Sequence, residues 1–178
     1  MLRLCSMISA GVLFLLSGAA ACAQAPHPLY NKTVQLAWTA NPVETSADGQ
    51  TITPHVAVNW TIYVSTAGRL FVRGARYVGR RGGYSDNAPG ATRNRLGEAT
   101  GVRFAGNRLV GNLAYTMGAL NFVVTFDPAF GSCSVHVMYG REGGKMMRRG
   151  VDGVMRQINS VTASGESCSV RDGNAFAD

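Results

Sequence analysis

Beyond residue 22, the chain has no apolar run long enough to cross a membrane as a helix. Its one long apolar stretch, Met7 to Cys22, has about 16 residues, whereas a spanning helix needs roughly 20. Arg3 precedes this stretch, and small residues follow it up to Ala25. This layout is typical of a secretory signal peptide. We therefore expect cleavage of residues 1–23 and a single exported domain, residues 24–178, that is periplasmic or secreted and has no transmembrane helix.

Cys22 allows a second outcome at this terminus. Ala19-Ala20-Ala21 precedes it and forms a loose lipobox, although a Leu is usual at the first of these positions. Cleavage before Cys22 would leave a lipid-bearing terminus and a lipid-anchored envelope protein. On the sequence alone, both outcomes stay open.

The chain also lacks the patterns of familiar catalytic and metal sites. It has no Cys-x-x-Cys pair, and its three histidines, His27, His55 and His136, are far apart in sequence. No serine has a lysine three residues on, and no Gly-x-Ser-x-Gly elbow occurs. The ten acids are scattered, and no glycine-rich phosphate loop opens a helix. We therefore predict a non-catalytic protein with no metal, nucleotide or cofactor; an enzyme of unrecognised type is the less favoured interpretation.

Cysteine is scarce, and two of the four cysteines fall within residues 1–23. Two cysteines in an exported domain usually pair, so we predict a disulfide between Cys133 and Cys168. Both stand in the tetrapeptide Ser-Cys-Ser-Val. We interpret this match as two neighbouring strands with like-facing cysteines.

Lysine is scarce as well, so arginine dominates the charge. The chain carries +7 at neutral pH, and loss of Arg3 leaves +6. Between Arg69 and Arg108 there are nine arginines and two acids, so this segment alone carries +7. Its glycine-rich part, residues 79–98, is predicted to be a long exposed loop. Four arginines and a tyrosine of this loop are the candidate anion-binding residues: Arg80, Arg81, Arg93, Arg95 and Tyr84.

Period-2 alternation of apolar residues is the main structural pattern. Its clearest case is Val56 to Val64, where every second residue is apolar. Similar short segments separated by glycine-containing turns predict an all-β fold, an antiparallel sandwich or small barrel of about 7–9 short strands. Trp38 and Trp60 fall on the inward side of their strands.

The C-terminal third is less regular. Apolar residues within 145–158 would suit a short helix, although Gly150 and Gly153 weaken it. A final hairpin is predicted around Ser164-Gly165, followed by a frayed tail at 172–178. Lys145, Arg148 and Arg149 form a second basic cluster in the sequence.

These features favour a small exported module that binds an anionic envelope component, such as a glycan or phospholipid, or an acidic protein through an arginine-rich face. One alternative is a small-ligand carrier with a closed, lipocalin-like barrel. A less favoured alternative is an outer-membrane barrel of about eight strands.

Overall fold

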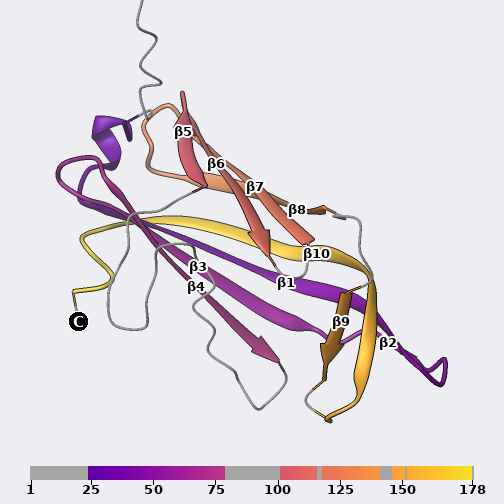
Figure 1. Cartoon of the computed structure of the whole chain (residues 1–178). Coiled ribbons are helices and arrows are strands. Elements are labelled where there is room, and N and C mark those ends of the chain that lie inside the picture. The colour runs from indigo at the N-terminus through magenta and orange to yellow at the C-terminus, as the bar shows by residue number, and fades with distance from the viewer. Residues whose placement is uncertain (1–23, 79–100, 116–117, 141–145, 151, 178) are drawn as a thin grey trace, which may run out of the picture.

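The computed structural model of the chain describes residues 24–78, 101–115, 118–140, 146–150 and 152–177. The expected signal peptide, Cys22 and the predicted loop 79–98 lie outside these residues. The described residues form one short 3-10 helix and ten strands (Figure 1). Their bounds are η1 His27–Leu29, β1 Lys32–Ser46, β2 Thr51–Ile52, β3 Val56–Val64, β4 Leu70–Val78, β5 Val102–Ala105, β6 Arg108–Tyr115, β7 Gly118–Phe126, β8 Cys133–Gly140, β9 Met146–Arg149 and β10 Met155–Asp172. No helix among them is long and apolar enough to span a membrane.

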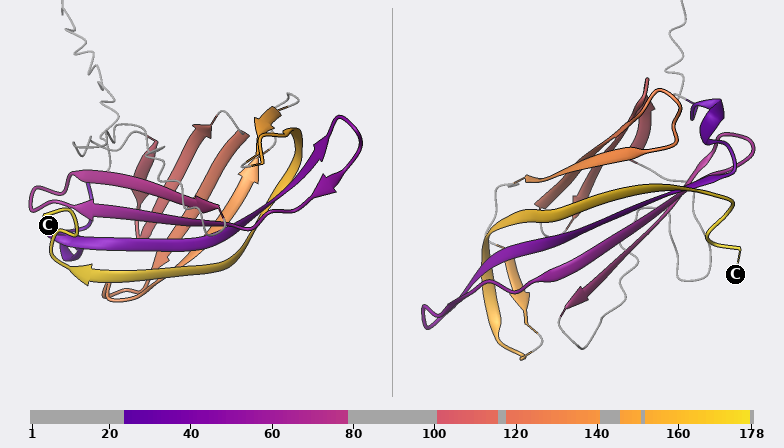
Figure 2. Two further views of the ribbon diagram at one scale, coloured as in Figure 1. Left: turned by 90° about the horizontal axis from the view of Figure 1, so that it is seen from below. Right: turned by 180° about the vertical axis from the view of Figure 1, so that it is seen from behind.

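The strands form two antiparallel sheets, so the all-β prediction is confirmed. The larger sheet has the order β4-β3-β1-β10-β9, with β2 paired to β1, and the smaller has the order β5-β6-β7-β8. The long strands β1 and β10 curve, which bends the larger sheet into a half-barrel with the smaller sheet across it (Figure 2). The described strands therefore form two sheets, and these are not joined into one closed ring. At 15 and 18 residues, β1 and β10 are far longer than the short strands we predicted.

The facing sides of the two sheets build one apolar core. In β3 every second residue from Val56 to Val64 is buried, as the alternation predicted. Trp38 and Trp60 are 3% and 2% exposed, which confirms their inward placement. The Trp60 ring meets Phe122 of the smaller sheet at 5.7 Å between centroids. Side chains from both sheets thus fill the space between them.

Strand β10 takes the place of the predicted final hairpin. It runs unbroken through Ser164-Gly165 because Gly165 and Glu166 form a bulge: Ala37 pairs with Ser167, Thr39 pairs with Ser164, and the two residues between them oppose Trp38. Gly165 takes a φ of +63°, which suits the first residue of such a bulge. The short helix that residues 145–158 would suit does not form in the described part of that segment. The chain instead pairs β9 with the start of β10, and Gly153, at a φ of +81°, supplies the turn between them.

The bulges decide which side chains of β10 face the core. A second register shift lies between Val43 and Glu44 of β1, opposite Asn159. Each extra residue reverses the alternation of faces. Consequently Val161 and Ala163, then Cys168 and Val170, all pack against the core although their numbers change from odd to even.

A disulfide joins Cys133 to Cys168, with 5.5 Å between their Cα atoms, as predicted. The two cysteines lie in neighbouring strands and both pack against the core, as interpreted, but the strands belong to different sheets: Cys133 opens β8 of the smaller sheet and Cys168 lies in β10 of the larger one. Two hydrogen bonds also join β8 to the larger sheet. The Val137 N–H donates to Glu166 Oε1 at 2.7 Å, and Trp38 Nε1 donates to Tyr139 Oη at 2.8 Å.

The segment after β10, which we expected to be frayed, makes specific contacts in the structure. The Gly173 N–H donates to the Asn31 carbonyl at 2.7 Å, and the Ala175 N–H donates to Thr33 Oγ1 at 3.1 Å. The ring of Phe176 lies 5.0 Å from the Arg73 guanidinium carbon. Residues 173–177 therefore cover the start of β1 and part of β4.

Replacing both Cys133 and Cys168 by alanine should lower the free energy of unfolding by about 3–4 kcal/mol, because the disulfide closes a loop of 35 residues. Equilibrium unfolding in urea measures this loss. The native protein under reducing conditions is the matched comparison, and equal stability of all three samples would contradict the prediction.

Gly111 of β6 has no room for a side chain, since an added Cβ would lie 2.3 Å from the Phe122 ring. Gly111→Ala should therefore destabilise the protein by about 1–3 kcal/mol through overpacking. Gly131→Ala is the matched control, because a Cβ there would meet only Asp127, at 3.8 Å. Equal unfolding midpoints for the two variants would show that the contact between Gly111 and Phe122 does not constrain the core.

Candidate anion-binding surface and buried ion pairs

The candidate residues predicted from sequence, Arg80, Arg81, Arg93, Arg95 and Tyr84, all lie outside the described residues. Other arginines of the same +7 segment are described, and the structure divides them between the two sheets. In the larger sheet, Arg69 directly precedes β4 and Arg73 lies within it. In the smaller sheet, Arg103 lies in β5 and Arg108 opens β6. Their surroundings differ in a way that decides which of them can meet a partner.

Arg103 and Arg108 form an exposed basic pair on the outer face of the smaller sheet. Arg103 pairs with Val110 and Arg108 with Ala105, so the two arginines are diagonal neighbours. Their Cα atoms are then about 7–8 Å apart. No described carboxylate forms a salt bridge with either side chain. Both guanidinium groups are thus available to an anion.

The whole outer face of β5–β8 is free of acids. None of the four strands contains an Asp or a Glu. His136 of β8 belongs to the same face, because Val110 pairs with Val123 and Val123 pairs with His136. We call Arg103, Arg108 and His136 the basic face. Two acids of the described residues flank this face. Asp127 follows β7 directly, and Glu166 Oε1 lies 3.8 Å from His136 Nδ1 and already accepts the Val137 N–H.

Arg69 and Arg73 are engaged by aromatic rings of the larger sheet and the tail. The guanidinium carbon of Arg69 lies 5.7 Å from the Phe71 ring centroid, and that of Arg73 lies 5.0 Å from the Phe176 ring centroid. Such stacking holds a guanidinium in place through the ring quadrupole. The structure therefore does not bring these two arginines together with Arg103 and Arg108.

Sequence reasoning missed a set of buried charges near the β9–β10 turn. The inward side of β1 changes from apolar to polar at its C-terminal end, where Glu44 is 1% and Ser46 is 8% exposed. Arg148 Nη1 lies 3.6 Å from Glu44 Oε1. Arg156, 3% exposed, donates two hydrogen bonds to Asp152 at 2.8 and 2.6 Å. Extending the alternation of β1 by a few residues would have placed Glu44 inside.

The arginines of the basic cluster noted at 145–149 point in different directions in the structure. Lys145 lies outside the described residues, Arg148 faces Glu44, and Arg149 is exposed on the opposite side of β9. Two of the hairpin's three described arginines, Arg148 and Arg156, are therefore occupied internally. Arg149 alone remains directed to solvent.

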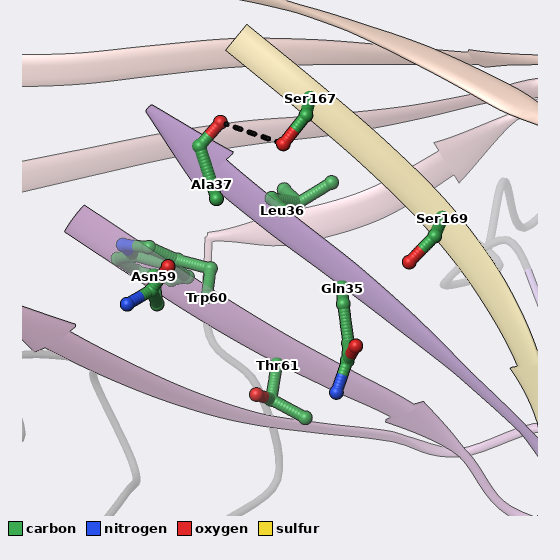
Figure 3. Close-up of a pocket in the computed structure, with 8 residues that line it drawn as sticks. All are labelled: Gln35, Leu36, Ala37, Asn59, Trp60, Thr61, Ser167 and Ser169. Atoms are coloured by element: carbon green, nitrogen blue, oxygen red, sulfur yellow. Dashed lines mark hydrogen bonds between the residues drawn. The ribbon is translucent and has the colours of Figure 1, made fainter. Parts of the chain in front are cut away.

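A second surface feature is a shallow groove of about 240 Å³ on the outer face of the larger sheet (Figure 3). Neighbouring strands β3, β1 and β10 line it with small or uncharged polar side chains: Asn59, Thr61, Gln35, Ala37, Ser167 and Ser169. Ser167 Oγ donates to the Ala37 carbonyl at 3.4 Å. The groove offers amide and hydroxyl groups but no charge, so its chemistry differs from that of the basic face.

The sequence matches no protein-family model and no curated protein, and the fold matches no solved structure. Function is therefore inferred from the side chains and charges of this chain alone.

The Asp152–Arg156 pair predicts a loss of stability in acid. Hydrogen bonds from Arg156 hold the pKa of Asp152 down, from 3.8 to about 2. Since the folded-state pKa is the lower one, the pair stabilises the protein above about pH 4, and this contribution disappears as the pH falls towards 2. Asp152→Asn should therefore lower the denaturant midpoint at neutral pH, and the difference from the native protein should close in acid.

Asp172→Asn is the matched control for this titration. Asp172 also forms an ion pair, with Lys32 at 3.4 Å, but its side chain is 92% exposed. An exposed pair of this kind contributes little to stability. The Asp152–Arg156 pair would not be the source of the acid sensitivity if the denaturant midpoints of the native protein and Asp152→Asn differed by the same amount from neutral pH to pH 2.

Proposed function

We propose that the protein is a small, exported, non-catalytic β-domain that binds an anionic partner through the basic face, together with the candidate loop residues Arg80, Arg81, Tyr84, Arg93 and Arg95. The observation that carries the proposal is the pair Arg103 and Arg108, exposed, without a described ion-pair partner, on four strands that contain no acid. A glycan sulfate, a lipid phosphate or a carboxylate-rich protein surface offers the complementary charge.

Export is part of the proposal and has two supports. The first is the signal-like layout of residues 1–23. The second is the Cys133–Cys168 disulfide, since disulfides persist in oxidising compartments and are rare in the cytosol. A lipid on Cys22 would keep the same domain at the envelope surface.

The carrier alternative draws less support from the described residues. A carrier needs an open interior, whereas the inner faces of the two sheets meet through Trp60 and Phe122. Neither the basic face nor the neutral groove contains a paired nucleophile and base, so binding is the function that their chemistry favours.

Heparin retention tests the basic face. Changing Arg103 and Arg108 together to Gln should weaken binding about 2- to 30-fold and lower the salt concentration needed for elution, because two exposed charge contacts are lost. The control is the double change of Lys32 and Arg171 to Gln, which removes the same charge from β1 and β10 of the larger sheet. The elution salt of each variant is the measurement.

A third variant examines the loop predicted from sequence, with Arg80, Arg81, Arg93 and Arg95 all changed to Gln. Reduced retention of both this variant and the Arg103/Arg108 variant would support one continuous binding surface. The proposed site is wrong if all variants elute at the same salt concentration as the native protein. It is also wrong if the control variant loses as much retention as the Arg103/Arg108 variant.

A further inference from the structure

Exposed apolar side chains gather at one place in the structure. Four large apolar residues are exposed among the described residues: Met138 at 46%, Met147 at 53%, Val154 at 41% and Met155 at 41%. Three of the four, all but Met138, belong to the β9–β10 hairpin. A soluble domain gains nothing from placing them in water, and clustered exposed apolar groups mark contact sites.

Two of these side chains lie on one face of the hairpin, and the third belongs to its turn. Met155 pairs with Arg149 and Met147 pairs with Gln157, so Met147 and Met155 are diagonal neighbours on one face. This face is opposite to that of Arg156, which is buried. Val154 stands at the turn that closes the hairpin, where the Gly150 N–H donates to its carbonyl at 2.8 Å. The turn lies at the end of the larger sheet, away from the smaller one (Figure 1).

The charges of the hairpin complement an anionic surface. Asp152, in the same turn, is held in a bidentate ion pair by the buried Arg156, so its negative charge is compensated. Arg149 is exposed beside Met155. The tip therefore offers apolar side chains and an available cation. Apolar side chains next to cations are the combination that binds the interface of an anionic lipid bilayer.

The size of this patch argues for lipid over a protein partner. A stable protein interface uses about 20–30 residues on each side. The described tip offers Met147, Val154, Met155 and Arg149, far short of that number. A bilayer makes no such demand, because each apolar group that enters the acyl boundary adds to the affinity independently.

We propose that the β9–β10 hairpin is a membrane-docking tip, with Met147, Val154 and Met155 entering the headgroup and acyl boundary of an anionic bilayer and Arg149 contacting phosphate. This inference goes beyond the proposed function, because the tip is a second surface on the larger sheet, separate from the basic face on the smaller one. The apolar side chains of the tip supply one part of the contact, and Arg149 supplies the part that salt weakens.

Flotation with vesicles tests the tip. The probes are phosphatidylcholine vesicles with and without phosphatidylserine, at low and high salt. Changing Met147, Val154 and Met155 together to Gln should weaken binding to the anionic vesicles about 10-fold or more, and the loss should persist at high salt. Met138→Gln is the comparison variant, because Met138 is similarly exposed but lies on β8 beside His136, away from the tip. It should leave the binding that remains at high salt unchanged.

Two checks make the comparison specific. Intact mass shows whether residues 1–23 or a lipid on Cys22 are present, so that native and variant chains are compared in the same form. Thermal unfolding shows that the exposed substitutions leave the fold intact, as expected for surface positions.

The outcomes separate this inference from the proposed function. If the native protein is retained on heparin but does not float with anionic vesicles, or if the triple variant floats as the native protein does, the docking tip is wrong and the proposed function stands. If neither probe binds, both are wrong. If the triple variant instead converts a dimer into a monomer in sedimentation velocity, the hairpin joins two copies of the chain and the lipid assignment is overturned.

Discussion

Strand β8 is the edge of the smaller sheet, and its attachment to the larger sheet holds the two halves of the fold in register. The Cys133–Cys168 disulfide fixes one end of β8, and the Tyr139 hydroxyl accepts the indole N–H of Trp38 near the other. Between them Glu166 accepts the Val137 N–H. An exposed strand edge otherwise offers unpaired N–H and C=O groups to other chains. The Glu166 carboxylate satisfies one of these groups, the Val137 N–H.

The attachment depends in turn on the Gly165 bulge. Gly165 and Glu166 together oppose Trp38, so the bulge turns the Glu166 side chain towards β8 and moves Cys168 onto the inner side. With regular pairing, the alternation that places Ala163 inside would place Cys168 outside. One glycine at a φ of +63° therefore sets the positions of both the covalent and the polar link.

The short-range pattern predicted the architecture well and the long-range geometry poorly. Alternation over Val56 to Val64 identified β3 and its buried side, because a single uninterrupted period was present. In β10 two bulges reverse the alternation, so the sequence reads as separate short pieces with a turn at Ser164-Gly165. At the site, the charge bias of the +7 segment was visible. The diagonal pairing of Arg103 and Arg108 depends on strand register, which composition does not encode.

Burial of ionic groups then decides which arginines can meet a partner. Arg156 is nearly inaccessible and would be costly to bury without the carboxylate of Asp152. The pair compensates Asp152, the one acid in the described part of the hairpin turn. Arg148 is directed inward too, but it forms only a longer ion pair, with 3.6 Å between its Nη1 and Glu44 Oε1. Among the described arginines, those left exposed and without a described ion-pair partner include Arg149, Arg171, Arg103 and Arg108. The positive charge presented to a partner is thus a product of the internal pairing as much as of the excess of arginine.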